Sequence, residues 1–289
     1  MAALSSADQE LLQVVIAIGA ALGLLGALFI ISMFTCYKHL RSFAFRLVFY
    51  LALCDAGDTI VTLIGTGTTA ACALQGVAHS FFSLASVFWI DVIAWVLYSS
   101  VVGQRDDARQ KEPTYVCGVF GVSLVLALAP LLSGSYDESI SGLCWLSEKS
   151  QRTTALVWQL VQFYSVLWFS FFFATWCYYR VYKSSQYLLN SISDMSEDLR
   201  ENTLRRTGKL MYYPLTLVCA YFFSTVDRFY LFFNFNSPSL TLLCLHNALA
   251  SMMGLMNCIV YGLNTRVREQ IMDCCSKAEP EHSQELAGV

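Results

Sequence analysis

Charged residues are scarce in this sequence. Asp, Glu, Lys and Arg make up 13% of the 289 residues, about half of the roughly 25% that is typical of soluble domains. Hydrophobic residues make up 56%, and the mean hydropathy is +0.52. This composition excludes an ordinary soluble domain and predicts an integral membrane protein in contact with the lipid bilayer. The net charge of −3 is also too small to indicate a nucleic acid polymer as a partner.

The sequence lacks features that three classes of membrane protein require. A retinal protein needs a Schiff-base lysine in its last helix, and residues 240–262 contain none. An enzyme needs His, Cys and Asp at nucleophile or metal-ligand spacing, which the sequence lacks, so no catalytic residue, cofactor or metal centre is predicted. A seven-helix transporter should show repeats with paired helix breaks. Pro130 and Pro214 form no such repeat, although a small-solute transporter remains the alternative.

Seven apolar runs have the length of about 20 residues that a membrane-spanning helix needs. The sequence therefore predicts an all-α membrane protein, a seven-transmembrane helix bundle that occupies residues 11–262. Residues 1–10 lack the basic stretch that begins a signal peptide, so the first run is expected to stay as a helix. The runs are residues 11–37, 43–65, 73–102, 114–133, 153–182, 209–233 and 240–262.

The positions of Lys and Arg predict the orientation of the chain. With the N-terminus outside, all but three of the 18 basic residues lie in cytoplasmic segments or at cytoplasmic helix ends. The exceptions are Lys149, Arg152 and Arg228. Because positive residues stay on the cytoplasmic side, we expect a multi-pass plasma membrane protein. Residues 1–10 would be extracellular and the tail, residues 277–289, cytoplasmic.

The cysteines agree with this orientation. Of 11 cysteines, only Cys72 and Cys144 lie in outward connectors, where the compartment is oxidising. They are predicted to form a disulfide between the start of the third helix and the second outer loop. The alternative is two unrelated free thiols, because sequence alone does not fix connectivity.

Two cytoplasmic segments have helical patterns. In residues 183–208, the third cytoplasmic loop, apolar residues recur at helical spacing, so the fifth helix is expected to continue as an amphipathic arm. A solvated linker is the alternative. Residues 264–276 predict a short eighth helix on the membrane surface, with Asn264 as its N-cap. Cys274 and Cys275 would be palmitoylated there; alternatively, they are small apolar residues at the interface.

Polar residues within the spans mark a candidate switch. Asp55 and Asn257 each lie nine residues from an interfacial arginine, about 14 Å deep at a rise of ~1.5 Å per residue. Equal depth predicts a contact between the second and seventh helices, direct or through water or a sodium ion. Tyr261 lies four residues after Asn257, which repeats the Asn-Pro-x-x-Tyr spacing of rhodopsin-like receptors. Pro214 predicts a kink in the sixth helix. A fixed structural hydrogen bond is the alternative.

A second polar set lies in the outer halves of the helices. Arg228, His79 and His246 are predicted to converge on a ligand that arrives from outside, and Lys149 and Arg152 add positive charge above them. A guanidinium suits an anionic group, especially a phosphate. Alternatively, Arg228 extends to the interface, and each histidine is a helix-packing residue.

Several stretches together resemble one family, the cyclic-AMP-receptor-like G-protein-coupled receptors, including their plant-type relatives. These are residues 40–51 followed by Asp55, Cys144-Trp145, Tyr212-Tyr213-Pro214, and residues 253–264. The resemblance implies a seven-helix receptor that signals to a heterotrimeric G protein at its cytoplasmic face. Cyclic AMP is implied as the ligand only for the amoebal branch. We therefore expect a cell-surface receptor for a cyclic nucleotide or another small anionic molecule.

Overall fold

The computed structural model describes most of the chain. The described residues are 5–64, 68–104, 107–139, 142–146, 152–191, 212–233 and 239–262, together with Val267, Arg268 and Met272.

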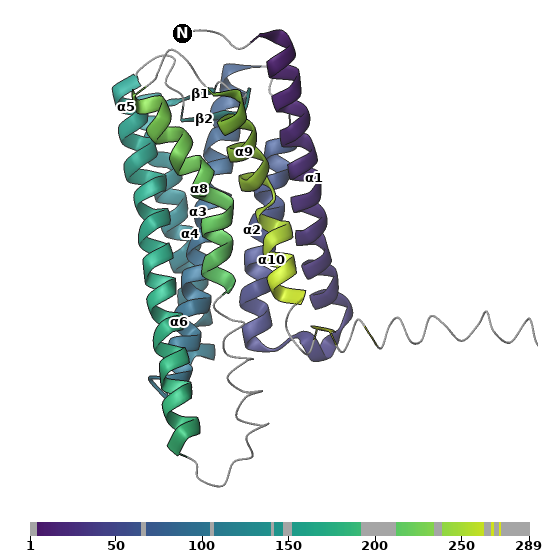
Figure 1. The fold of residues 1–289 in the computed structure, drawn as a ribbon, viewed down its shortest axis with the longest axis vertical. Helices are drawn as coiled ribbons and strands as arrows, with labels where there is room; N and C mark the ends of the chain where they lie inside the picture. The colour runs from purple at the N-terminus through teal and green to yellow at the C-terminus, as the bar shows by residue number, and fades with distance from the viewer. Residues whose placement is uncertain are drawn as a thin grey trace, which may run out of the picture.

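Within these residues, seven helical rods lie side by side in a bundle (Figure 1), which confirms the predicted fold. Short 3-10 turns, η1 (Lys38–Leu40) and η2 (Asp107–Arg109), connect neighbouring rods. The rods are α1 (Ser6–Cys36), α2 (Phe43–Leu63), α3 (Thr69–Val101), α4 (Glu112–Leu128) with the 3-10 turn η3 (Ala129–Ser133), α5 (Arg152–Trp158) with η4 (Gln159–Tyr164) and α6 (Ser165–Ser191), α8 (Tyr212–Phe233), and α9 (Leu240–Ser251) with α10 (Met253–Gly262).

Local sequence explains where several rods begin. The Ser5 hydroxyl accepts a hydrogen bond from the Asp8 amide at the start of α1, and Thr68 does the same for Ala71 at the start of α3. These are ordinary N-caps, which satisfy backbone donors that lack a helical partner. Pro113 stands in the first turn of α4, where a missing amide hydrogen costs nothing.

The last rod is not the single straight helix that the run 240–262 predicts. Its two halves, α9 and α10, meet at Met252 with a bend of 49°. The break lies where the backbone of this rod packs directly on α1. A Cβ atom added to Gly26 would lie 2.5 Å from the Leu255 Cα atom, closer than real contacts allow. Small residues at such a seam let two helix backbones approach closely.

The core of the bundle lies around α3, which contacts α2, α4, α6 and both strands. Trp89 is fully buried near the middle of α3 and stacks on Tyr50 of α2, with ring centroids 4.9 Å apart. In contrast, many large apolar side chains on α1, α4 and α6 face outward. This distribution is the one expected of helices that are surrounded by lipid tails.

A short hairpin covers the end of the bundle at which α1 begins. Strands β1 (Tyr136–Glu138) and β2 (Cys144–Leu146) pair antiparallel, with Tyr136 opposite Leu146. Cys144 forms a disulfide with Cys72 at the start of α3, as predicted, with Cα atoms 5.2 Å apart. Burial raises the pKa of the Tyr136 phenol, so this hydroxyl keeps its proton and donates to the Ala127 carbonyl at 2.7 Å.

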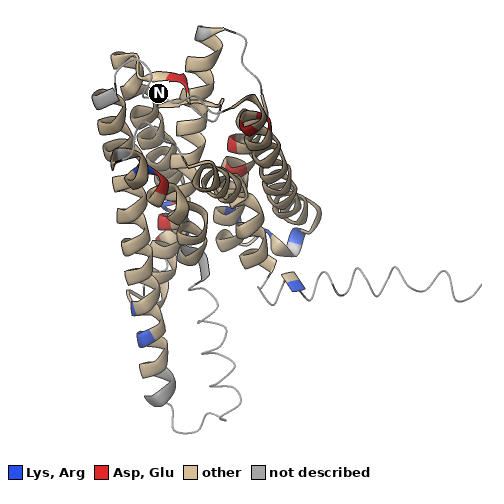
Figure 2. Ribbon diagram, turned by 45° about the horizontal axis from the view of Figure 1, so that its top comes forward, with Lys and Arg blue, Asp and Glu red and all other residues tan. Residues whose placement is uncertain are grey.

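Basic residues gather at the opposite end, as Figure 2 shows most clearly on the far part of α6. The two ends of the bundle therefore differ in charge, in the pattern that membrane proteins adopt around the cytoplasmic boundary. The described members of this set are Lys38, Arg41, Arg46, Arg109, Lys111, Arg180, Lys183 and Arg268.

Several predictions concern residues outside the described set. The helix α6 extends to Ser191, within the segment 183–208 for which an arm is predicted, and residues 192–208 are not described. Of the predicted eighth helix, Val267, Arg268 and Met272 have helical conformation, and Val267 is buried. Asn264, Lys149, Cys274 and Cys275, the tail, and the side chains of Arg152 and Pro214 lie outside the described residues.

Candidate functional site

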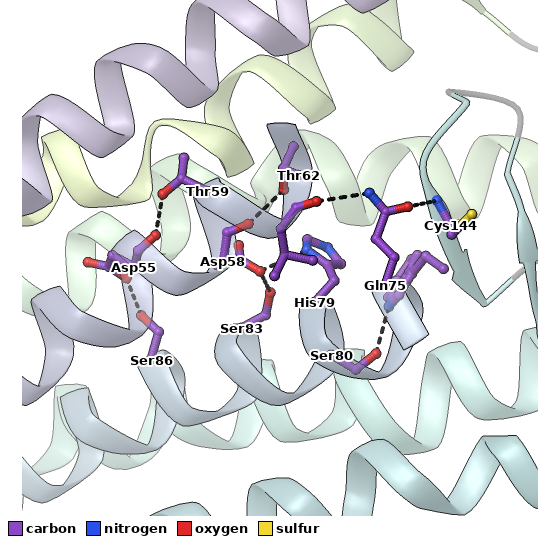
Figure 3. Close-up of polar contacts among 12 residues, drawn as sticks. Asp55, Asp58, Thr59, Thr62, Gln75, His79, Ser80, Ser83, Ser86 and Cys144 are labelled. Atoms are coloured by element: carbon purple, nitrogen blue, oxygen red, sulfur yellow. Dashed lines mark hydrogen bonds and ion pairs between the residues drawn. The ribbon is translucent and has the colours of Figure 1, made fainter. Parts of the chain in front are cut away.

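A buried polar cluster joins four rods at mid-depth, and Asp55 of α2 lies at its centre. The Asp55 carboxylate accepts a hydrogen bond from the Ser86 hydroxyl at 2.6 Å and from the Asn257 amide at 2.8 Å. Thr216 of α8 donates to the Asn257 side-chain oxygen at 3.4 Å. Figure 3 shows Asp55 and Ser86 facing each other between α2 and α3. The predicted contact between Asp55 and Asn257 is therefore present, and it is direct.

Tyr261 lies one turn beyond this cluster but takes no part in its hydrogen bonds. Its side chain is 1% exposed and packs edge-on against Phe45, with ring centroids 5.6 Å apart. Within the described residues, its hydroxyl has no hydrogen-bond partner. The spacing from Asn257 to Tyr261 thus places both on one buried face, where Tyr261 fills space between α2 and α10.

A second polar cluster lies one turn from the first, toward the hairpin. Asp58 accepts a hydrogen bond from the Ser83 hydroxyl at 2.9 Å and pairs with the His79 ring nitrogen Nδ1 at 2.7 Å. In Figure 3 these side chains bridge α2 and α3. The His79 ring also meets Trp145 of β2 edge-on, so the hairpin closes over this pair.

A third pair, from α8 and α9, faces the second across the bundle. The His246 Nδ1 atom lies 3.1 Å from an Asp227 carboxylate oxygen, and Asp227 is fully buried. The neighbouring Arg228 directs its guanidinium over the Trp145 ring, 5.6 Å from the centroid. Arg228 therefore contacts the hairpin through Trp145.

These groups enclose a polar cavity of about 70 Å³. His79, Arg228 and His246, the three residues that the sequence placed together, all line it. Its wall also includes an acid, several hydroxyls and four aromatic side chains, of which Trp145 belongs to the hairpin. The other lining residues are Asp58, Thr62, Ser83, Ser139, Leu143, Trp145, Phe163, Tyr164, Tyr221, Ser224, Asn247, Ala250 and Ser251.

Two main residues of this wall, Asp58 and Trp145, were not among the predicted ligand-binding residues. Asp58 follows Asp55 by three residues, so both lie on one face of α2, and helical spacing was a sufficient signal to include it. No helical spacing in the sequence relates Trp145 to the other residues of the wall. It reaches the cavity only because β1 and β2 fold back over the bundle and the disulfide holds β2 beside α3.

A further ion pair stands at the basic end of the bundle. The Arg46 guanidinium of α2 lies 2.6 Å from the Glu112 carboxylate at the start of α4. The Tyr50 hydroxyl donates to the same carboxylate at 3.1 Å, and its ring stacks on Trp89. The pair thereby connects the basic end to the core around α3.

Comparison with known proteins gives a consistent match. The family model described as "Slime mold cyclic AMP receptor" matches residues 3–272. "G-protein coupled receptor 1" of Arabidopsis thaliana is 28% identical, over 96% of this chain and 86% of its own. "G-protein coupled receptor 157" of Homo sapiens is 29% identical, over 90% and 83%. "Cyclic AMP receptor-like protein A" of Dictyostelium discoideum is 24% identical, over 88% and 65%.

The fold also matches a solved structure. Squid rhodopsin superimposes with a TM-score of 0.73, over 97% of this chain and 89% of its own, at 17% sequence identity. At this identity the match concerns the arrangement of the helices alone, since one fold serves many functions.

Proposed function

The chain belongs to the slime mold cyclic AMP receptor family, and from this premise we propose that it is a plasma membrane receptor that binds a small anionic ligand outside the cell. The ligand's signal passes to a heterotrimeric G protein at the cytoplasmic face. Residues 1–10 and the hairpin are then extracellular, the seven rods of residues 11–262 span the bilayer, and residues 183–208 and 277–289 are cytoplasmic.

One observation carries this proposal. His79, Arg228 and His246 come from three different rods and line one cavity below the disulfide-linked hairpin. Arg228 supplies a permanent positive charge, and a guanidinium binds phosphate or carboxylate in a fixed fork geometry. The basic residues at the other end of the bundle support an extracellular location for this cavity. Lys149 and Arg152, near the hairpin in sequence, would add positive charge at its mouth.

The cluster around Asp55 is the proposed switch between the cavity and the cytoplasmic face. It connects α2, α3 and α10 through Ser86 and Asn257, and Thr216 adds α8. A network with two arrangements can convert a small change at a ligand into a movement of whole helices. Pro214, near the start of α8, favours a bend in the helix that moves. A sodium ion at Asp55 would stabilise one arrangement.

The eighth helix, residues 264–276, is proposed to lie on the inner membrane surface. Val267 already packs in a buried cluster with Phe45 and Tyr261, so this segment begins against the bundle. Palmitoylation of Cys274 and Cys275 would hold its remainder in the lipid.

The test is GTP exchange by a G protein heterotrimer in vesicles that contain the full chain. Cyclic AMP, inorganic phosphate and acidic single-chain lipids are added in turn from the extracellular side. We expect one of these anions to accelerate exchange. Arg228→Gln should raise the half-maximal concentration of that anion about tenfold or more, which corresponds to the loss of a charged hydrogen bond. Arg180→Gln, at the basic end of α6, serves as the control. Flux of a labelled solute without GTP exchange would instead favour the transporter.

A further inference from the structure

A large apolar crevice opens on the lipid-facing side of the bundle, between the α5–η4–α6 rod and α8. Its volume is about 680 Å³. Among the described residues that line it, Arg228 is the sole charged one, so the crevice is an apolar slot with one positive group at its edge. The remaining wall is Leu156, Gln159, Leu160, Tyr164, Ser165, Trp168, Phe172, Thr225, Phe229 and Phe233.

The crevice and the polar cavity share two wall residues, Arg228 and Tyr164. A small cavity with polar groups in its wall and a much larger apolar space therefore adjoin at the Arg228 side chain. Sites for small molecules typically measure about 300–1,000 Å³. The crevice falls within this range, whereas the cavity of about 70 Å³ has room for a head group only. The matching ligand has a small acidic head and a long apolar tail.

The wall between the two spaces has a specific construction. Residues 159–164, η4, form a turn of π-helix within an otherwise α-helical rod, and such turns occur frequently at functional sites. Gln159 in this turn is 1% exposed and donates from Nε2 to the Leu146 carbonyl at 2.7 Å. Its oxygen, Oε1, has no hydrogen-bond partner among the described residues. A buried acceptor of this kind fits a ligand that carries a hydroxyl donor beside its acidic group.

We propose that the crevice and the cavity together hold one anionic amphiphile, a single acyl chain with a phosphate head group and a neighbouring hydroxyl. The phosphate binds Arg228, the hydroxyl donates to Gln159, and the chain lies along the aromatic wall of α6 and α8. The ligand reaches the site sideways from the outer leaflet, between the fifth and sixth rods. This inference rests on the proposed function only for the assignment of the outer side.

The experiment is photolabelling of the full chain in discs of phosphatidylcholine, a neutral lipid. The probe is a lysophosphatidate with a diazirine near the end of its acyl chain, and labelled peptides are mapped by mass spectrometry. We expect labelling to concentrate on α6 and α8, along which the acyl chain is placed. Oleoyl lysophosphatidate should compete, whereas glycerol 3-phosphate, which lacks the chain, and monooleoylglycerol, which lacks the charge, should not.

Two substitutions form a matched pair. Leu160 and Val161 are neighbours with similar exposure, 50% and 59%, but only Leu160 lines the crevice. Leu160→Trp fills the slot and should lower labelling about tenfold or more, as expected for overpacking of a filled site. Val161→Trp adds the same ring toward bulk lipid and should leave labelling unchanged. Arg228→Gln should weaken lysophosphatidate competition by roughly tenfold or more.

Other outcomes overturn the inference. Equal labelling of the Leu160→Trp and Val161→Trp variants would mean that the probe labels the protein from bulk lipid and not from the crevice. Crosslinks between two copies of the chain would mean that the crevice belongs to a dimer interface. Stabilisation by cyclic AMP that requires Arg228 but ignores Leu160→Trp would leave the proposed function standing and remove the lipid ligand. Conversely, crevice-dependent labelling without GTP exchange for any anion would keep this inference and remove the proposed signalling.

Discussion

At the scale of single residues, carboxylates set the polar interior of this bundle. Asp55, Asp58 and Asp227 are each held by a donor from another rod: Asn257, His79 and His246 respectively. An ionisable group in a membrane span is costly and is usually retained for function. The rods therefore meet through specific polar contacts in addition to apolar packing, and single substitutions at these contacts should have measurable effects.

Replacement of Asp55 by Asn should separate its structural role from its proposed role as a switch. Asn cannot accept from both Ser86 and Asn257 as the carboxylate does, so we expect a loss of about 1–3 kcal/mol in stability. We also expect loss of any effect of sodium on ligand affinity. Thermal unfolding and ligand titration in sodium and in potassium measure the two. Asp8→Asn, at the exposed start of α1, is the control. Unaltered signalling and sodium response would remove the switch.

The ion pair of Arg46 and Glu112 offers a comparison with an exposed pair in the same region. The side chains of the first pair are 28% and 16% exposed, whereas those of Lys111 and Asp107 are 48% and 46% exposed. We expect a double-mutant cycle to give a coupling of about 1 kcal/mol or more for the first pair and about 0–0.5 kcal/mol for the second. Equal couplings would show that the partial burial of the Arg46–Glu112 pair does not strengthen it.

At the scale of elements, sequence patterns predicted the rods well but not their irregularities. Hydropathy marks seven spans because each crosses the same thickness of lipid. It does not mark the bend at Met252 or the π turn of residues 159–164, because both depend on where neighbouring rods place their backbones. The crevice was therefore not predictable either, since its wall depends on that π turn.

The seam between α1 and the last rod gives a direct test of this dependence. Gly26→Ala would place a methyl group against the backbone of Leu255, and we expect a loss of about 1–3 kcal/mol from overpacking. Gly121→Ala on α4 is the matched control, because a Cβ there meets nothing within 4 Å. The control should be neutral or slightly stabilising, since Ala favours helix over Gly by up to about 1 kcal/mol. Thermal unfolding in detergent measures both, and similar shifts would contradict the seam.

At the scale of the whole molecule, the candidate site was predictable in part. Arg228, His79 and His246 were placed together because all three lie at similar depth in different spans. Trp145 and the pairing of each histidine with a carboxylate require the tertiary fold, since they depend on helix rotation and on the return of the hairpin. Sequence thus indicated three of the residues that face the cavity, but not which carboxylates the two histidines contact.

The disulfide should stabilise the end of the molecule that contains the cavity. It closes a loop with a sequence separation of 72 residues, for which chain entropy gives a contribution of up to about 4 kcal/mol. We expect Cys72→Ala with Cys144→Ala to lower the unfolding temperature and to weaken ligand binding through displacement of Trp145. Reducing agent should lower the unfolding temperature of the wild type and leave the double variant unaffected. An effect on both would implicate other thiols.

The glycine seam also joins the first spanning segment of the chain to the last. The first and last rods, which are far apart in the sequence, therefore lie side by side in the bundle. A chain divided within residues 192–211 yields two fragments, and each carries one half of the seam. We expect the two fragments, produced together in one cell, to reassemble into a working receptor without a peptide bond between them.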